Sequence, residues 1–208
     1  MMRFFRDLFG GMDEDQGTYL IAGLGNPGRQ YKNTRHNVGF MLMDRLAGRL
    51  EVDFTRMELK ALVTRTKYRE KRLILAKPQT FMNSSGGAVG SLLRYYKVPL
   101  ANLLVAYDEV DLDLGTLRLR PDGGAGGHKG MASIIKNLGT QEFSRLRLGI
   151  GRPPGRKAAA DYVLRDFTQT EREIQSEVLD RAVDAVLAFV LEGVDAAMNR
   201  YNGSIEDL

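Results

Sequence analysis

The stretch Leu103-Leu-Val-Ala-Tyr107-Asp108 decides the fold of this 208-residue chain, because it is a short apolar run that ends directly in a carboxylate. Such runs are typical of buried strands. Proteins of the α/β class place their functional groups at the ends of these strands. We therefore expect Asp108 to lie at a strand end, within a functional site.

Strand-like runs and helical patterns alternate on both sides of this stretch. Apolar residues at helical spacing predict helices over 38–50, 88–96, 131–138, 174–190 and 194–201. Gly139 is the expected C-cap of the third helix. Further strands are expected at 19–23, 61–66, 73–76, 116–119 and 146–150. The alternation predicts an α/β domain with helices on both faces of its sheet.

The composition of the chain narrows the class of protein. Its length suits one substantial core, so we expect a single domain over 18–208. The absence of Cys excludes disulfides and a Cys-based zinc site and fits a reducing, cytoplasmic environment. No run of 18 apolar residues is present, so we expect no membrane span. Residues 1–17 mix acidic with apolar residues and are expected to form a flexible extension, not a secretory signal.

Charge is unevenly distributed along the chain, although the net charge is only +4. Between Gly115 and Lys157 there are nine Lys or Arg residues against two acidic residues. From Asp161 to Leu208 there are four against eleven. This asymmetry favours one face for a polyanion and another turned away from it. A solvated surface gives the same pattern, so charge supports a nucleic-acid partner only in combination with a site.

The segment Gly23-Leu-Gly25-Asn-Pro-Gly28 matches the GxGxxG fingerprint of dinucleotide-binding proteins. That fold requires a helix to open inside the turn. Residues 29–36 are instead polar and lack helical periodicity. We therefore interpret the segment as a strand that ends in a tight turn and displays Asn26, and we expect no nucleotide cofactor.

Two histidines, His36 and His128, lie in polar loops rich in Gly or Asn. A lone histidine is usually a structural hydrogen-bonding group. His36, however, directly precedes a predicted helix, and we expect it to be accessible. Because histidine titrates near neutral pH, it is a natural general base for a water molecule. Such a base needs a third group to fix its tautomer, and Asp108 is the best candidate.

Two further loops contribute polar groups. Asn83 lies where a strand passes into a helix, where Asn83, Ser84 or Ser85 can cap the helix and an amide can bind a carbonyl or an oxyanion. The glycine-rich loop 123–130 opens a helix and lets backbone N–H groups approach phosphate or substrate. The acidic run 108–113 does not complete a calcium-loop pattern, so we expect no metal.

Together, and in this order, these segments closely resemble the bacterial-type peptidyl-tRNA hydrolases. The matching blocks are GLGNPGRQYKNTRHNVGF (23–40), KPQTFMNSSGGAV (77–89), VAYDEVDLDLGTLRLR (105–120), GGAGGHKG (123–130) and RLRLGIGRP (145–153). The match extends from about Tyr19 to Asn202. The resemblance implies a three-layer α/β domain around a twisted, mixed and mostly parallel sheet. It also implies a cytoplasmic monomer that hydrolyses the ester joining peptide to tRNA, without a cofactor.

The resemblance also implies roles for individual residues. His36 matches the catalytic base and Asp108 its partner. Asn26 and Asn83 match residues that hold the peptide and orient the site, and Asn83 would also stabilise the oxyanion. The surrounding substrate cleft is matched by Tyr31, Phe81 and Met82, with His128 on its rim. The basic positions that contact tRNA are matched by Arg120 and Arg147.

One position departs from the family pattern. After the loop histidine the family usually has Asn, thought to help hold the water or the oxyanion, whereas this chain has Lys129. A lysine can donate a hydrogen bond but cannot accept one, and its charge can reach substrate or tRNA phosphate. Lys129 is also the feature that favours an alternative, a non-catalytic RNA-binding protein of the same fold. The other matched site residues favour the hydrolase.

Overall fold

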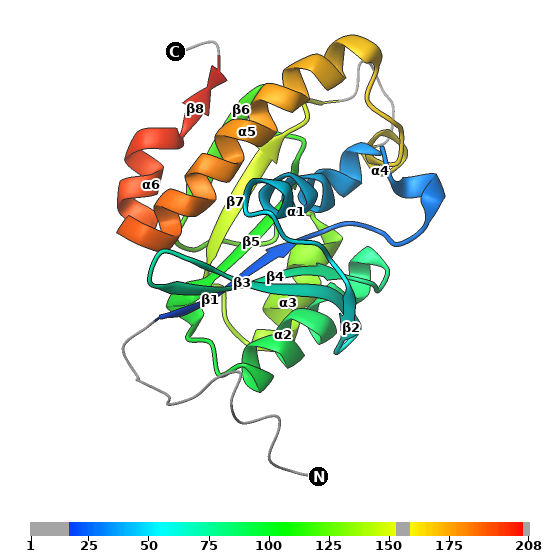
Figure 1. Cartoon of the computed structure of the whole chain (residues 1–208). Helices are drawn as coiled ribbons and strands as arrows, with labels where there is room; N and C mark the ends of the chain where they lie inside the picture. The colour runs from blue at the N-terminus through cyan, green and yellow to red at the C-terminus, as the bar shows by residue number, and fades with distance from the viewer. Residues whose placement is uncertain (1–16, 153–158, 206–208) are drawn as a thin grey trace.

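Eight strands form one sheet in the computed structural model, which describes residues 17–152 and 159–205 of the chain (Figure 1). The strand order is β2-β3-β4-β1-β5-β7-β6-β8. The four central strands are parallel to one another: β4 (Lys71–Pro78), β1 (Thr18–Gly23), β5 (Leu103–Glu109) and β7 (Ser144–Gly149). Apart from Gly17, the expected N-terminal extension lies outside the described residues.

The outer strands pair antiparallel. They are β2 (Arg56–Glu58) and β3 (Ala61–Tyr68) at one edge, and β6 (Thr116–Arg120) and β8 (Gly203–Ser204) at the other. The sheet is therefore mixed, as expected. Parallel pairing is confined to the four central strands, and four of the seven strand pairs are antiparallel, so the sheet is not mostly parallel. The turn between β3 and β4 is too short for the crossover that parallel neighbours need, so these strands form a hairpin.

Helices cover both faces of the sheet, which confirms the three-layer α/β prediction (Figure 1). One face carries α1 (Val38–Arg49), α5 (Gln169–Glu192) and α6 (Val194–Tyr201), and the other carries α2 (Ser85–Tyr95) and α3 (Lys129–Leu138). Successive side chains of β1 enter opposite cores, Ile21 on the first face and Leu20 on the second. Gly139 caps α3 in the left-handed conformation, as expected. Among the described residues, no helix has the length and hydropathy needed to cross a membrane.

The start of α1 lies against β1 and β5 at a distance that only glycine permits. A Cβ on Gly39 would lie 2.4 Å from the Leu24 nitrogen and 2.6 Å from the Ala106 oxygen, both of them backbone atoms. The preceding 3-10 turn (Arg35–Asn37) therefore meets the carboxyl end of the central strands. This close approach brings His36 next to Asp108.

We expect Gly39→Ala to lower the free energy of unfolding by about 1–3 kcal/mol, because an added methyl group forces backbone atoms apart. Gly48→Ala in the same helix is the control, since a Cβ there meets nothing within 4 Å. Alanine in place of this helical glycine should stabilise the protein by about 0.5–1 kcal/mol. Urea unfolding measures both effects, and equal stabilities of the two variants would contradict the packing argument.

Candidate active site

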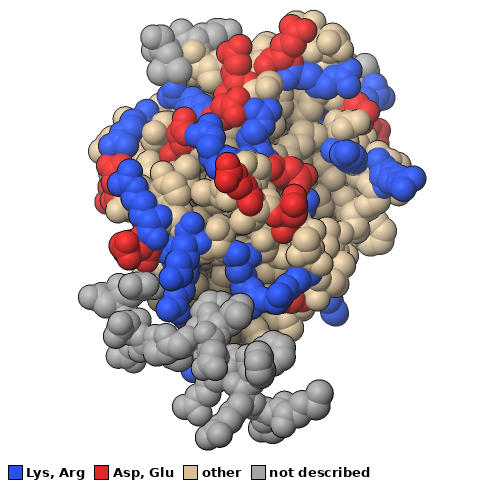
Figure 2. All heavy atoms as spheres, in the orientation of Figure 1, with Lys and Arg blue, Asp and Glu red and all other residues tan. Residues whose placement is uncertain are grey.

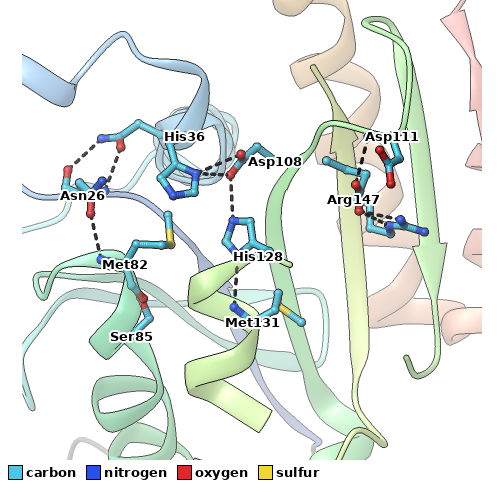
Figure 3. A network of polar contacts seen from close by, with 11 residues as sticks. Asn26, His36, Met82, Ser85, Asp108, Asp111, His128, Met131 and Arg147 are labelled. Atoms are coloured by element: carbon cyan, nitrogen blue, oxygen red, sulfur yellow. Dashed lines mark hydrogen bonds and ion pairs between the residues drawn. The ribbon is translucent and has the colours of Figure 1, made fainter. Parts of the chain in front are cut away.

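A buried carboxylate at the end of β5 contacts both histidines (Figure 3). Asp108 is 4% exposed, and its Oδ1 lies 2.8 Å from His36 Nδ1 and 3.0 Å from His128 Nε2. Its Oδ2 lies 3.0 Å from His36 Nδ1. The structure thus brings His36 and Asp108 together. It also places His128 in contact with Asp108, inside the site and not on its rim.

Burial and the two histidines act in opposite directions on the pKa of the Asp108 carboxyl. Burial by itself would raise this pKa, but the interactions with His128 and then with His36 outweigh burial. The pKa of Asp108 consequently lies well below its usual range. Asp108 therefore stays ionised at neutral pH and can accept hydrogen bonds from both rings.

The two histidines differ in the partner of their second ring nitrogen. His128 Nδ1 accepts a hydrogen bond from the Met131 backbone N–H at 3.2 Å and so caps α3. The proton of a neutral His128 is therefore on Nε2, where it is donated to Asp108. His36 directs Nδ1 at Asp108, which leaves its Nε2 for a ligand or water. Of the two rings, His36 is the one placed to act as a base.

The same three side chains offer ligand atoms that all lie within 4.8 Å of one another: His36, Asp108 and His128. Two imidazoles and a carboxylate can hold a divalent metal. A metal on His128 Nε2 would move the ring proton to Nδ1, where it would face the donor N–H of Met131. The donor set therefore suits a hydrogen-bonded triad better than a metal site.

His36 and Asp108 line a pocket of about 420 Å³. One side is formed by the turn that carries Phe81, Met82 and Asn83, and another by the glycine loop that ends in His128 and Lys129. A third side, which the sequence did not indicate, is apolar and comes from α4 (Ala159–Val163) and the next residue: Ala159, Ala160, Val163 and Leu164. The pocket thus joins acid–base groups to an apolar wall.

His36 is less accessible than the sequence suggested, with an exposed fraction of 9%. Its neighbours Arg35 and Asn37 are also buried, at 4% and 2% exposure, because both find hydrogen-bonding partners in the interior. The expectation that His36 is accessible therefore holds only on the side that lines the pocket. A ligand reaches His36 through the pocket.

Asn26 is held in a single orientation. Its backbone N–H donates to Asn37 Oδ1 at 2.8 Å, and its backbone oxygen accepts from Asn37 Nδ2 at 2.9 Å. Its side-chain Oδ1 accepts from the Met82 backbone N–H at 2.9 Å, which leaves Nδ2 as a donor. Because Asn26 lines the pocket, this amide group can donate to a ligand carbonyl.

The segment that resembles a dinucleotide-binding fingerprint is a tight turn, as expected. A 3-10 turn (Arg29–Tyr31) follows it, and α1 begins only at Val38. Backbone N–H groups of a helix therefore do not point at this turn as a pyrophosphate would require. Tyr31, expected in the substrate cleft, is half-buried in the 3-10 turn and lies outside the residues that line the pocket.

Asn83 is exposed in a 3-10 turn (Met82–Ser84) and lines the pocket. The alternative role as a helix cap is not used, because the N-cap of α2 is Ser84 and its side chain makes no capping hydrogen bond. Ser85 donates its hydroxyl to the Met82 oxygen. Asn83 Oδ1 accepts a long hydrogen bond of 3.5 Å from Ser84 Oγ, and its Nδ2 remains as a donor to a ligand.

Four arginines share one face of β6 and β7, because the antiparallel register pairs Arg118 with Arg147 and Arg120 with Arg145. Arg120 is exposed. Arg147 Nη2 lies 2.6 Å from Glu109 Oε2, and this ion pair offsets the charge of Arg147. By contrast, on the side of the molecule that carries α1 and α5, Lys and Arg are interspersed with acidic residues (Figure 2).

A wider hollow of about 1070 Å³ lies along α1 on the other side of Asn26. Its lining includes Asp44, Arg45 and Lys77 but no histidine. Lys77 pairs there with Asp44 at 2.5 Å, and Arg45 pairs with Asp180 of α5 at 2.6 Å. The groups suited to acid–base chemistry therefore belong to the smaller pocket.

A mixed α/β sheet that holds a His–Asp pair in a pocket, with amide donors beside it, has the arrangement of a hydrolase site in which a histidine can activate water. The chain belongs to the peptidyl-tRNA hydrolase family, whose model matches residues 20–207.

Several peptidyl-tRNA hydrolases are similar to this chain over almost nine tenths of its length. A peptidyl-tRNA hydrolase of Chloroflexus aggregans is 52% identical over 88% of this chain and 98% of its own length. A peptidyl-tRNA hydrolase of Thermoanaerobacter sp. (strain X514) is 48% identical over 89% of this chain and 100% of its own length. The crystal structure of peptidyl-tRNA hydrolase from Acinetobacter baumannii matches with a TM-score of 0.85 at 33% identity, covering 91% of this chain and 96% of that one. The fold and the family are thereby shown.

We expect the Asp108 carboxyl to remain ionised at pH 4, where an ordinary aspartate is about half protonated. Because its folded-state pKa is lowered, its contribution to stability is complete above the ordinary aspartate range and is lost as the pH falls through the folded-state value. The carboxyl ¹³C signal of Asp108, followed by NMR on acidification, measures this. An inflection at pH 4 or above would refute the assigned pairing.

Proposed function

We propose that this protein hydrolyses the ester bond between a peptide and tRNA, acting as a monomer in the cytoplasm. One observation carries the proposal: His36 presents Nε2 to a pocket while an ionised Asp108 holds its Nδ1. Membership of the peptidyl-tRNA hydrolase family supports the choice of substrate.

The proposed reaction begins with neutral His36. Its Nδ1–H donates to Asp108, so the lone pair of Nε2 removes a proton from water as the water attacks the ester carbonyl. The Asn83 amide, with a backbone N–H of the loop 123–130, stabilises the tetrahedral oxyanion. His36 then returns the proton to the 3′ oxygen of the tRNA as the ester bond breaks. No covalent intermediate is needed, and Ser85 is already engaged with a backbone oxygen.

Selectivity for peptidyl-tRNA would come from amide groups that pair with the peptide. Asn26 is fixed as a donor into the pocket, and Asn83 offers both a donor and an acceptor. Phe81 and Met82 lie beside them and would contact the substrate's apolar parts. An unblocked aminoacyl group lacks the peptide amide and leaves these polar groups unpaired, which is a strong means of rejection.

Affinity for tRNA would come from phosphate contacts that do not read base sequence. Arg120 is exposed on β6, and Lys129 is exposed at the first residue of α3 while lining the pocket. Arg147 would contribute through its Nη1, because Glu109 takes its Nε and Nη2. Binding through such contacts weakens with rising salt concentration.

A non-catalytic RNA-binding protein of the same fold is the alternative, and Lys129 favours it because it replaces an expected Asn. The geometry of His36 favours catalysis, since binding alone would not require a histidine whose tautomer is fixed by a buried carboxylate. Tight tRNA binding without cleavage would support the non-catalytic RNA-binding protein.

In the presence of EDTA, the purified protein is expected to release the N-blocked aminoacyl group from tRNA and to spare unblocked aminoacyl-tRNA. His36→Ala should lower kcat by about 10²–10⁴-fold, because the general base is lost. His36→Asn is the matched variant, since its amide can still donate to Asp108 and keep the fold. Circular dichroism and unfolding curves control for structure. Activity retained in both variants would refute the assignment of the base.

Asn26→Asp tests selectivity with a side chain of the same shape. The Asp carboxylate can still accept from the Met82 N–H, but it replaces the donor to the peptide carbonyl with a negative charge. We expect kcat/KM for blocked aminoacyl-tRNA to fall roughly tenfold to a hundredfold. Asn33→Asp adds the same charge to an exposed position of the same loop and controls for repulsion of tRNA. Equal losses in the two variants would contradict the direct contact.

A further inference from the structure

We infer that Arg35 is a positioning residue that fixes the apolar wall of the pocket to the turn carrying His36. Arg35 directly precedes His36 in the chain, and its side chain bonds to the segment between α4 and α5. The base and the wall are thereby held at one spacing. This role is distinct from the contacts of His36 with Asp108.

Arg35 is 4% exposed, and its side chain donates hydrogen bonds through both terminal nitrogens. Nη1 donates to the backbone oxygens of Arg165 and Asp166 at 3.1 and 2.9 Å. Nη2 donates to both carboxylate oxygens of Glu171, at 2.8 and 2.6 Å. The guanidinium carbon also lies 4.3 Å from the ring centroid of Tyr162 in α4. These contacts use the planar fork of arginine, which lysine cannot reproduce.

Backbone contacts join the same two segments. The Arg35 N–H donates to the Arg165 oxygen at 3.1 Å, and Thr34 forms an antiparallel bridge with Asp166. Arg165 directly follows Leu164, the last residue of the apolar wall. Anchoring the Arg165 oxygen therefore anchors the wall.

Glu171 connects this anchor to the start of α5. Its Oε2 accepts from the Thr168 backbone N–H at 2.7 Å, and its own N–H donates to Thr168 Oγ1, which completes a capping box. Burial would raise the pKa of Glu171, but the hydrogen bonds from Arg35 and Thr168 lower it below its ordinary value. One ionised carboxylate thus begins α5 and holds Arg35.

The consequence for catalysis concerns geometry. The wall faces the same pocket as the Nε2 atom of His36, so a displaced wall lets the ester carbonyl move away from the attacking water. Small misplacements of reacting groups lower the rate steeply. The proposed contacts with tRNA phosphates lie elsewhere, notably at Arg120 on β6. Affinity for tRNA should therefore change little.

Two other ion pairs, both between α1 and α5, provide controls for the loss of the pair of Arg35 and Glu171. Arg45 in α1 pairs with Asp180 in α5 at 2.6 Å, and Arg49 pairs with Asp184 at 3.2 Å. Both pairs are more exposed than the pair of Arg35 and Glu171 and lie away from the pocket of His36. Arg45→Lys therefore reports the effect of weakening an ion pair on stability alone.

The test compares Arg35→Lys, Glu171→Gln, the double variant and Arg45→Lys in the full chain. For Arg35→Lys, we expect kcat on N-blocked aminoacyl-tRNA to fall roughly tenfold to a hundredfold, with KM changed by less than about twofold. Hydrogen exchange of the amides in 159–168 should accelerate, while the sheet stays protected. The double variant should lose no more activity than the worse single variant, because Glu171 acts on the wall through Arg35. Arg45→Lys should keep its kcat.

Several results would overturn the inference: an unchanged kcat, a loss that matches the unfolded fraction, additive losses in the double variant, or unchanged exchange in 159–168. If Arg35→Lys does not fold, Glu171→Gln carries the same test, because glutamine preserves the volume and the capping acceptor. The kinetic measurements rest on the proposed function, whereas the exchange measurement does not. A wild-type protein without hydrolase activity would refute that function and leave the exchange result to decide the anchoring role.

Discussion

One carboxylate shared by two imidazoles sets the geometry on which the site depends. Asp108 is 4% exposed, and an unpaired charge in such surroundings costs on the order of several kcal/mol, so donors must lie where β5 ends. His36 supplies one donor from the turn before α1, and His128 supplies the other from the start of α3. Because α1 and α3 cover opposite faces of the sheet, this carboxylate joins all three layers at the pocket.

The three-residue turn before α1 extends this constraint to the rest of the pocket. Asn37 holds the backbone of Asn26, His36 meets Asp108, and Arg35 reaches the segment after α4. Consecutive side chains thus set the amide donor, the base and the apolar wall. The turn can lie so deep because Gly39 allows α1 to touch the backbone of the central strands.

Apolar periodicity predicted the long helices and the central strands, because burial repeats regularly along them. It missed β2 and β8, which are three and two residues long and depend on pairing at a sheet edge. Polar residues in a loop were taken as exposed, yet Arg35 and Asn37 find partners 130 and 11 residues away, which no local pattern reveals. The contact of His128 with Asp108 and the apolar wall at Val163 are likewise tertiary. The pairing of His36 with Asp108 was foreseen because each adjoins a recognisable local element: Asp108 lies at the end of a strand, and His36 precedes a helix.

The charges around the pocket explain how a lysine can stand where an asparagine was expected. Both carboxylates that line the pocket are engaged, Asp108 with the imidazoles and Glu109 with Arg147. Lys129 begins α3, where the helix N-terminus adds partial positive charge. The rim is therefore positive beside an interior of neutral donors such as Asn26. A substrate with a phosphate backbone on one side of its ester and an uncharged peptide on the other matches this division, so Lys129 is compatible with hydrolysis as well as with RNA binding.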